Sequence, residues 1–250
     1  MENTATGVLK KALDLLKYIS EADKPGGVTE ISNALHMPKA TVHRILNSLC
    51  DENVLLKTED GRYRIGPTVL LWSSAYNYKS GVVDIAQPLL EALRDKTRET
   101  LHLSVYEHGR AQYAARFDSP QTVVLRWSRL GTELPLYCTA AGRAILSRLT
   151  DEEVADYLSH TELKARTKRT VVARDKLKAM LARFRTLGYA EENQENEENI
   201  RCVGAAIVNR HGKPVAAISL TAPSFRFTDY DAIKTGPELA CIAQEISAKL

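Results

Sequence analysis

The sequence predicts an α+β fold in two domains: three helices and a β-hairpin come first, and helices packed on an antiparallel sheet follow. The length of 250 residues favours two domains over one. Three helical patterns precede the turn signal Asp60-Gly61, which lies between two segments rich in strand-forming residues. From Leu101 onward, apolar residues alternate with polar ones, which indicates β-strands.

The first domain is expected to begin with two helices separated by the helix-breaking segment 23–27. The first helix runs from residue 8 to about residue 22. Thr29 is a plausible N-cap for the second, which ends near Leu35. Each helix has one apolar face, made of Val8, Ala12, Leu15, Leu16 and Ile19 in the first and of Ile31, Ala34 and Leu35 in the second.

A third helix, expected over residues 38–49, has two contrasting faces. Its apolar residues follow the spacing i, i+3, i+4 and i+7 and form a stripe suited to the core. Pro38 suits the first helical position, and Asn53 can take the left-handed conformation that ends a helix. On its own, the pattern fits a DNA-reading helix and an ordinary amphipathic helix equally well. The apolar stripe is Val42, Ile45, Leu46 and Leu49, and the polar face, which has no carboxylate, is Lys39, Thr41, His43, Arg44, Asn47 and Ser48.

A β-hairpin after the third helix favours the DNA-reading alternative. We expect strands over 54–58 and 62–65, joined by a two-residue turn at Asp60-Gly61. Alternation along the second strand directs Arg62 and Arg64 away from the core. Three helices followed by such a hairpin make a winged helix-turn-helix, whose third helix enters the DNA major groove while the wing contacts the backbone.

The residues predicted to contact double-stranded DNA come from the second and third helices and from the wing. Residues 1–72 contain nine basic and nine acidic residues, which counts against nucleic-acid binding. The segment 36–47 nevertheless carries two cations and no acid, so a local patch for phosphates remains. A winged helix that binds a protein instead of DNA is an alternative. The predicted DNA contacts are Thr29, Lys39, Ala40, Thr41, His43, Arg44, Asn47, Arg62 and Arg64.

Two further helices, over about 68–78 and 82–96, are expected to link the domains. Trp72 and Tyr76 give the first of them an apolar surface that suits dimerisation and core packing equally well. The expected division is 1–72 for the winged helix-turn-helix, 73–96 for the linker helices and 97–250 for the second domain.

The second domain alternates strands and helices and contains several hairpin turns, which predicts an antiparallel sheet. Gly188 is expected to end a helix, and the acidic run 191–198 is expected to be a solvated, mobile loop. The expected strands are 101–106, 111–117, 123–127, 200–209 and 215–221, and the expected helices are 138–146, 151–159, 174–187 and about 229–248.

Composition argues against several other classes of protein. The hydrophobic content of 44% and the charged content of 26% are typical of globular proteins. No apolar run approaches the length of a membrane span, and the first residues lack the features of a signal peptide. The wide spacing of the cysteines fits reduced thiols in a cytoplasm and argues against a metal site or disulfides. The cysteines are Cys50, Cys138, Cys202 and Cys241.

An enzyme is the main alternative class. The chain lacks the Walker, dinucleotide-binding, zinc-protease and nucleophile-elbow motifs. Cys202 and His211 are the one thiol–base pair to consider, and the turn expected between them disfavours it. We therefore expect no catalytic residue and no cofactor.

Five segments in order resemble the IclR-type bacterial transcriptional regulators. The resemblance covers nearly the whole chain and implies a winged-helix domain joined by a helix to a GAF-like effector-binding domain. It also implies a homodimer or a dimer of dimers. Asn53, Arg143 and Tyr137 depart from residues common in the family, and Tyr137 leaves the identity of the effector open. The segments are 38–46 (PKATVHRIL), 61–67 (GRYRIGP), 99–105 (ETLHLSV), 135–144 (PLYCTAAGRA) and the stretch from 200 to 223.

A candidate pocket follows from pairing the last two strands. If their hairpin turns at 211–212, Cys202 lies opposite Thr221 and Gly204 opposite Ser219. That face offers a thiol, two hydroxyls and space at the glycine, which suits a small polar or anionic ligand. In the alternative, the hydroxyls face solvent and the cysteine packs as a small apolar residue. The resemblance favours the pocket and adds Gly131, Leu136, Tyr137, Glu192 and Ile200 around it.

The sequence therefore predicts a sequence-specific DNA-binding transcription regulator, either a repressor or an activator. A small polar or carboxylate effector, including an aromatic acid, is expected to bind in the C-terminal domain and to control DNA affinity or activity. The expected DNA partner is a palindromic operator.

Overall fold

The structure is a computed structural model that describes residues 4–22, 24–121 and 128–250, with the backbone alone for residues 4–6 and 76–80. It divides into two compact units, Met1–Ser80 and Gly81–Leu250. The strand expected over 123–127 lies outside the described residues. Among the described helices, none is both long and apolar enough to cross a membrane.

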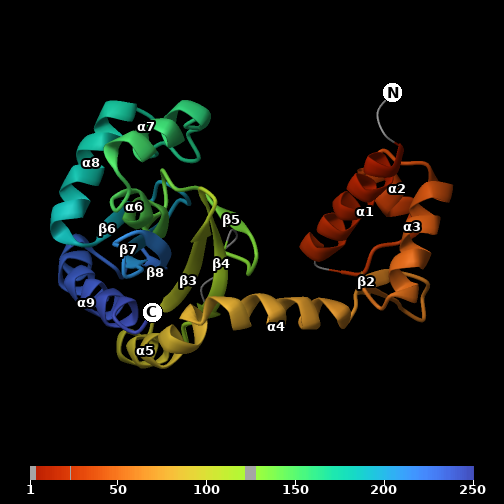
Figure 1. Ribbon diagram of the computed structural model, residues 1–250, viewed down its shortest axis with the longest axis horizontal. Helices are drawn as coiled ribbons and strands as arrows, with labels where there is room; N and C mark the ends of the chain where they lie inside the picture. Colours follow the sequence, from red (N-terminus) through yellow and green to blue (C-terminus); the bar gives the residue numbers. More distant parts are fainter. Residues whose placement is uncertain (1–3, 23, 122–127) are drawn as a thin grey trace. The chain divides into compact units, whose positions relative to one another are not determined.

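The first unit contains the three helices and the hairpin that the sequence predicts, in the expected order (Figure 1). A further helix follows the hairpin, as expected. The elements are α1 (Thr4–Glu21), α2 (Val28–Ala34), α3 (Lys39–Asp51), β1 (Leu55–Lys57), β2 (Tyr63–Ile65) and α4 (Thr68–Ser80).

The first three helices and the hairpin share one apolar core. Its members include the predicted stripe of α3, of which Val42 and Leu46 are fully buried, and Tyr63 of β2 closes it. Contrary to expectation, Val8 on α1 is exposed, so the core face of this helix starts one turn later. The core residues are Leu15, Ile19, Ile31, Val42, Ile45, Leu46, Leu55 and Tyr63.

Helix α3 ends as its sequence predicts. Asn53 takes the left-handed conformation, with φ at 55°. Its N–H donates to the carbonyl of Cys50 at 2.9 Å, and the N–H of Val54 donates to that of Leu49 at 2.9 Å, which together form a Schellman motif. Gly66 is required beside this turn because a Cβ there would lie 2.3 Å from the carbonyl oxygen of Asn53. These backbone contacts therefore fix the path of the chain between the end of α3 and the hairpin of the wing.

The turn of the wing is one residue longer than expected. Glu59, Asp60 and Gly61 form its loop, and the N–H of Thr58 donates to the carbonyl of Arg62 at 2.8 Å. Gly61 has φ at 75°, the left-handed position of a three-residue hairpin loop. The Thr58 hydroxyl, which accepts the N–H of Arg62 at 3.1 Å, stabilises this longer loop.

Two helix starts differ from the expectation. Helix α2 begins at Val28 with Gly27 as its N-cap, so Thr29 is not a cap. The carboxylate of Glu30 accepts the N–H of Gly27 at 3.5 Å, which is the half of a capping box that needs no side chain on the N-cap residue. Pro38 is the N-cap of α3 rather than its first residue, and its carbonyl accepts the first hydrogen bonds of the helix.

The second unit is an antiparallel sheet with helices on both faces (Figure 1), which confirms the predicted fold class. In the described residues the strand order is β5-β4-β3-β8-β7-β6, and the edge strands β5 and β6 were not predicted. Gly188 ends α8 in the left-handed conformation, as expected. The elements are α5 (Val82–Thr97), β3 (Thr100–Glu107), β4 (Arg110–Phe117), β5 (Glu133–Leu134), α6 (Ala140–Leu146), α7 (Asp151–His160), α8 (Arg174–Leu187), β6 (Ala190–Asn193), β7 (Ile200–Val208), β8 (Pro214–Pro223) and α9 (Asp229–Ser247).

Apolar side chains cover both faces of this sheet. One core joins α5 and α9 to β3, β7 and β8. The other lies on the opposite face, beneath α6, α7 and α8. Strand β3 is therefore buried on both sides, although its alternation of apolar and polar residues is typical of a half-buried strand: His102 and Ser104 have no solvent-facing side to occupy.

The acidic run 191–198 is structured, so the expected solvated, mobile loop is wrong. Its first residues belong to β6, and Glu192 and Glu195 are only 1% and 6% exposed. The guanidinium of Arg143 donates to both oxygens of Glu195, at 2.5 and 2.6 Å. Glu192 accepts the backbone N–H of Asn196 at 3.1 Å. These donors replace water around the buried carboxylates.

The packing of α6 on β7 gives a first test. A Cβ on Gly204 would lie 2.7 Å from the carbonyl carbon of Ala140 and 2.8 Å from the nitrogen of Ala141. Because backbone atoms yield little, we expect Gly204→Ala to lower the free energy of unfolding by about 1–3 kcal/mol, measured by urea denaturation. Gly7→Ala is the control, since it adds a methyl inside helix α1 where no atom lies within 4 Å and should not lower the stability. Equal stability of Gly204→Ala and wild type would contradict the close contact.

Candidate functional site

The outer face of α3 presents the predicted polar residues to solvent. Asn47 follows His43 by one turn, and their Nδ2 and Nδ1 atoms lie 3.4 Å apart. Lys39 and Arg44 are exposed, and neither forms an ion pair with another described residue, so their charges are accessible from solvent. The predicted DNA contacts on α2 and α3 are all at least partly exposed: Thr29, Lys39, Ala40, Thr41, His43, Arg44 and Asn47.

The two arginines of the wing differ in their surroundings. The guanidinium of Arg62 donates to the carbonyl of Pro25 at 2.8 Å and lies 3.5 and 3.4 Å from the carboxylates of Glu30 and Asp60. Arg64 is exposed and forms no ion pair within the described residues. Arg62 therefore helps to hold the wing against the α1–α2 connection, while Arg64 has its charge available to a phosphate.

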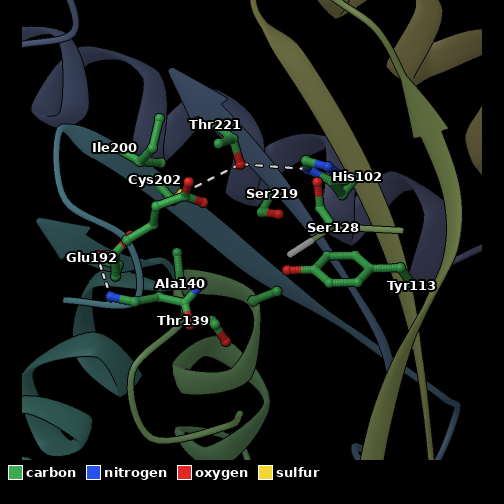
Figure 2. Close-up of a pocket in the computed structure, with 13 residues that line it drawn as sticks. His102, Tyr113, Ser128, Thr139, Ala140, Glu192, Ile200, Cys202, Ser219 and Thr221 are labelled. Carbon is green, nitrogen blue, oxygen red and sulfur yellow. Dashed lines mark hydrogen bonds between the residues drawn. The ribbon is translucent and has the colours of Figure 1, made fainter. Parts of the chain in front are cut away.

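A cavity of about 30 Å³ lies in the second unit, between the sheet and the start of α6 (Figure 2). Strands β3, β4, β6, β7 and β8 line it on the sheet side, and the first turn of α6 and the segment after β6 close it. The lining includes five residues that the sequence predicts, Glu192, Ile200, Cys202, Ser219 and Thr221.

The hairpin of β7 and β8 has the predicted register. Cys202 pairs with Thr221, and Gly204 pairs with Ser219. The two hydroxyl residues, Ser219 and Thr221, are 5% and 6% exposed because α6 and the segment after β6 cover this face. The alternative in which these hydroxyls face solvent is therefore wrong.

Four expected pocket residues do not line this cavity. Gly204 is displaced from it because the backbone of α6 fills the space beside the glycine. Leu136 is buried in the apolar core under α6 and α8. Tyr137 turns away and donates its hydroxyl to the carbonyl of Lys164 at 2.8 Å. Gly131, with φ at 78°, has no neighbour that a Cβ would touch within 4 Å.

Most of the lining that sequence reasoning missed comes from β3, β4 and the start of α6. His102 lies opposite Ser219 because β3 pairs with β8, a pairing that the sequence pattern did not predict. Figure 2 shows His102 beside Thr221, and Tyr113 with its hydroxyl directed into the cavity. The missed residues are His102, Tyr113, Ser128, Thr139, Ala140, Ala141, Asn196 and Glu197.

Thr221 is the centre of a small polar network. Its hydroxyl oxygen lies 3.3 Å from Cys202 Sγ and 3.4 Å from His102 Nδ1. Burial, with a smaller effect of Arg116, lowers the pKa of His102 to about 3, so the imidazole is neutral. His102 Nε2 and Ser128 Oγ have no hydrogen-bond partner among the described residues. Buried polar atoms that the protein leaves unpaired are available to a ligand.

The surroundings of Glu192 in the cavity wall shift the pKa of its carboxyl strongly. Burial raises the pKa of its carboxyl to about 7, although the backbone N–H groups of Glu195 and Asn196 and the thiol of Cys202 act in the opposite direction. The charge of Glu195 raises this pKa further, but Arg143 pairs with Glu195 directly. Near neutral pH, Glu192 therefore exists in both its neutral and its ionised form.

The cavity does not resemble a catalytic site. Burial and the neighbouring Glu192 raise the pKa of the Cys202 thiol well above its usual value, the opposite of what a nucleophilic thiolate needs. His211 lies in the turn of the hairpin, and Cys202 lies about 20 Å away along β7, so the two form no thiol–base pair. The described residues also contain no group of three His, Cys, Asp or Glu side chains placed to hold a metal ion.

Two family models match the chain. The model of the IclR helix-turn-helix domain matches residues 8–58, and that of the C-terminal part of the bacterial transcriptional regulator IclR matches residues 74–248. The acetate operon repressor of Salmonella typhimurium is 30% identical to this chain over 242 residues, which cover 96% of this chain and 88% of that protein.

Solved structures agree with these matches. Thermotoga maritima IclR has a TM-score of 0.84 and 31% identity, covering 98% of this chain and 99% of that one. An IclR homologue of Microbacterium hydrocarbonoxydans, solved with 4-hydroxybenzoate, has a TM-score of 0.82 over 97% of this chain and 98% of that one. At 22% identity, the second likeness supports the fold alone.

The pKa of Glu192 predicts how stability depends on pH. Folding raises this pKa from 4.5 to about 7, so the folded protein holds the proton more tightly than the unfolded chain does. The resulting stabilisation is complete below about pH 4.5 and is lost as the pH rises to about 7. Relative to Glu192→Gln, which has no proton to lose, wild type should lose about 3 kcal/mol across this interval in urea denaturation.

Glu198→Gln is the control for this prediction, because it removes a carboxylate from the same segment at an exposed position. A stability difference between wild type and Glu192→Gln that stays constant from about pH 4.5 to about pH 8 would falsify the assignment.

Proposed function

Because this chain belongs to the IclR family of bacterial transcriptional regulators, we propose that it binds an operator through α3 and the wing and responds to a small effector in the cavity of the second unit. The observation that carries the proposal is the combination, in one chain, of an exposed cationic recognition helix and a buried polar cavity. The Salmonella relative is named a repressor, which supports repression as the mode of control. The protein acts in the cytoplasm, where its DNA is, and we assign it no catalytic residue.

In this proposal, the exposed side chains of α3 read the major groove. Arg44 donates two hydrogen bonds to a guanine edge, and Asn47 pairs with an adenine edge. Lys39 at the start of the helix and Arg64 on the wing contact phosphates, which position the protein without specifying sequence. Arg62 contributes mainly by keeping the wing in place, since its guanidinium already contacts Pro25.

We propose that two copies bind a palindromic operator together. One winged-helix unit with equal numbers of acids and bases is expected to hold DNA weakly, and a two-fold pair doubles the contacts. Exposed apolar residues on α4 support a contact between copies, since Leu70, Leu71 and Trp72 are 68%, 70% and 52% exposed. A homodimer and a dimer of dimers both satisfy this argument.

The proposed effector is a small carboxylate. The cavity offers the hydroxyls of Tyr113, Ser219 and Thr221 as donors, together with the unpaired Ser128 Oγ. The 4-hydroxybenzoate in the Microbacterium relative supports a carboxylate in this fold. A volume of about 30 Å³ holds about two water molecules, so an acid of aromatic size requires the walls to move.

The DNA-binding part of the proposal is tested with two arginine variants. Arg44→Ala should lower the preference for operator over random DNA by about 10- to 100-fold, because it removes a base contact of about 1–3 kcal/mol. Arg64→Ala should weaken binding to both DNAs alike and reduce the slope of log affinity against log salt by about one. Both are measured by fluorescence anisotropy over a range of salt concentrations.

The Arg62→Ala variant tests whether Arg62 acts by holding the wing in place rather than by contacting DNA. It should lower the unfolding temperature of the first unit as well as DNA affinity, because it releases the wing from Pro25 and Glu30. Unchanged discrimination in Arg44→Ala would rule out α3 as the reader of the operator.

The effector-binding part of the proposal is tested at the paired strands. A Ser219→Ala, Thr221→Ala double variant should lose the effect of small carboxylates on DNA binding while it keeps operator affinity in their absence. Ser224→Ala, just after β8 and outside the cavity lining, is the control. A double variant that responds to the same carboxylates as wild type would remove these strands from the site.

A further inference from the structure

The cavity assigned to the effector has an unusual balance of charge. Among its described lining residues are two acids, Glu192 and Glu197, and neither lysine nor arginine. The imidazole in the lining, His102, is neutral because it is buried. Against these described lining residues, an incoming carboxylate meets the carboxyl of Glu192 with no lysine or arginine of the lining to balance it, which is unfavourable in a buried site.

Two arginines near the cavity, Arg143 and Arg201, are engaged elsewhere. Arg143 forms two short hydrogen bonds with Glu195, at 2.5 and 2.6 Å, and its Nε donates to the carbonyl of Tyr137 at 2.8 Å. Arg201 pairs with Asp229 on the other side of β7. Neither of these arginines belongs to the lining, so neither supplies the missing charge to a ligand.

The carboxyl of Glu192 is held in a fixed orientation. Its Oε1 accepts the N–H groups of Glu195 and Asn196, the second at 3.1 Å. An oxygen that accepts two hydrogen bonds is a poor place for a proton, so Oε2 is the oxygen that carries one. The residues with titratable or charged groups around this carboxyl are Glu195 and Glu197 of the following segment, Cys202 of β7, Cys138 and Arg143 near the start of α6, Tyr113 of β4 and His102 of β3, together with Arg166, whose charge acts on Tyr113 and Cys138, and Arg116, whose charge acts on His102.

We propose that Glu192 recognises the effector as a neutral acid, so that a small monocarboxylate enters the cavity together with one proton. The proton comes from solvent, binds Oε2 of Glu192 and is shared with an oxygen of the incoming carboxylate. The pair then carries one negative charge instead of two, and no covalent bond forms or breaks except that to the proton. This inference rests on the proposed function and specifies the chemistry by which the site selects its ligand.

Affinity for a carboxylate must then depend on pH in a defined way. The pKa of Glu192 in the free protein is about 7. Below that pH the proton is already present, and binding is independent of pH. Above it, binding takes up one proton, and affinity falls tenfold for each further pH unit. A neutral amide of the same shape has no such dependence on proton uptake.

The experiment is isothermal titration calorimetry of the full-length protein between about pH 6 and about pH 9. The probes are acetate, propionate, benzoate and 4-hydroxybenzoate, each compared with the corresponding amide. Wild type should lose affinity for the carboxylates about tenfold per unit above pH 7 and keep its affinity for the amides. Buffers of different ionisation enthalpy should report uptake of about one proton at the upper end.

Three variants give the matched controls. Glu192→Gln keeps a donor in place, so carboxylates should bind it independently of pH and more tightly than wild type at about pH 9. Glu192→Ala should also remove the pH dependence but bind more weakly, because it lacks the donor. Glu197→Gln changes the other acid of the lining and should keep the wild-type slope. Circular dichroism checks that each variant is folded.

The outcomes separate this inference from the proposed function. Carboxylate affinity that is independent of pH in wild type, or a slope that persists in Glu192→Gln, overturns the inference and leaves the effector site standing. Binding of amides but not of carboxylates overturns both the inference and the carboxylate class. If no probe binds at about pH 6, the inference also fails, while DNA discrimination by Arg44 tests the regulator itself independently.

Discussion

The cavity of the second unit depends on one buried ion pair, between Arg143 of α6 and Glu195 of the segment after β6. Both side chains are removed from solvent, and the guanidinium also donates to the carbonyls of Tyr137 and Glu191. The second carboxylate oxygen of Glu195 accepts the N–H of Val171. Removing one partner of such a pair leaves an uncompensated charge, which costs about 3–5 kcal/mol. The pair therefore fixes the segment whose backbone N–H groups orient Glu192, and through it the acid that faces the ligand.

A second constraint is the absence of side chains at two glycines, which allows α6 to pack closely on the sheet. Gly204 lets the backbone of residues 140–141 approach β7, and a Cβ on Gly142 would lie 2.4 Å from the Cα of Leu136. Small residues are therefore needed on both sides of this contact, which explains the run Ala-Ala-Gly at the start of the helix. The close approach places the first turn of α6 in the cavity wall, next to Cys202 and Ser219. The packing of α6 and the shape of the cavity thus depend on the same few positions.

Local patterns were enough to predict much of this molecule. The helical stripe of α3, the left-handed Asn53 and the pairing of Cys202 with Thr221 all follow from periodicity and turn chemistry, because their causes lie within a few residues of sequence. The site residues on β3 and β4 could not be found in this way. His102 reaches the cavity only because β3 pairs with β8, more than a hundred residues away. Tyr113 pairs with Ser104 just beyond a β-bulge, which breaks the alternation that a pattern assumes. The acidic run was misjudged because its partner, Arg143, is distant in sequence.

The composition of the cavity wall determines which ligands can enter. Buried hydroxyl, imidazole and carboxyl groups need hydrogen-bond partners, so a ligand gains affinity only if its own polar atoms supply them. A hydrocarbon of the right size leaves Ser128 and His102 unpaired, at a cost of about 1–3 kcal/mol for each buried group. A doubly charged acid brings more negative charge than a wall whose described residues include neither lysine nor arginine can balance. Polarity excludes apolar molecules and charge excludes polyanions, which leaves small ligands that carry oxygen atoms and at most one negative charge.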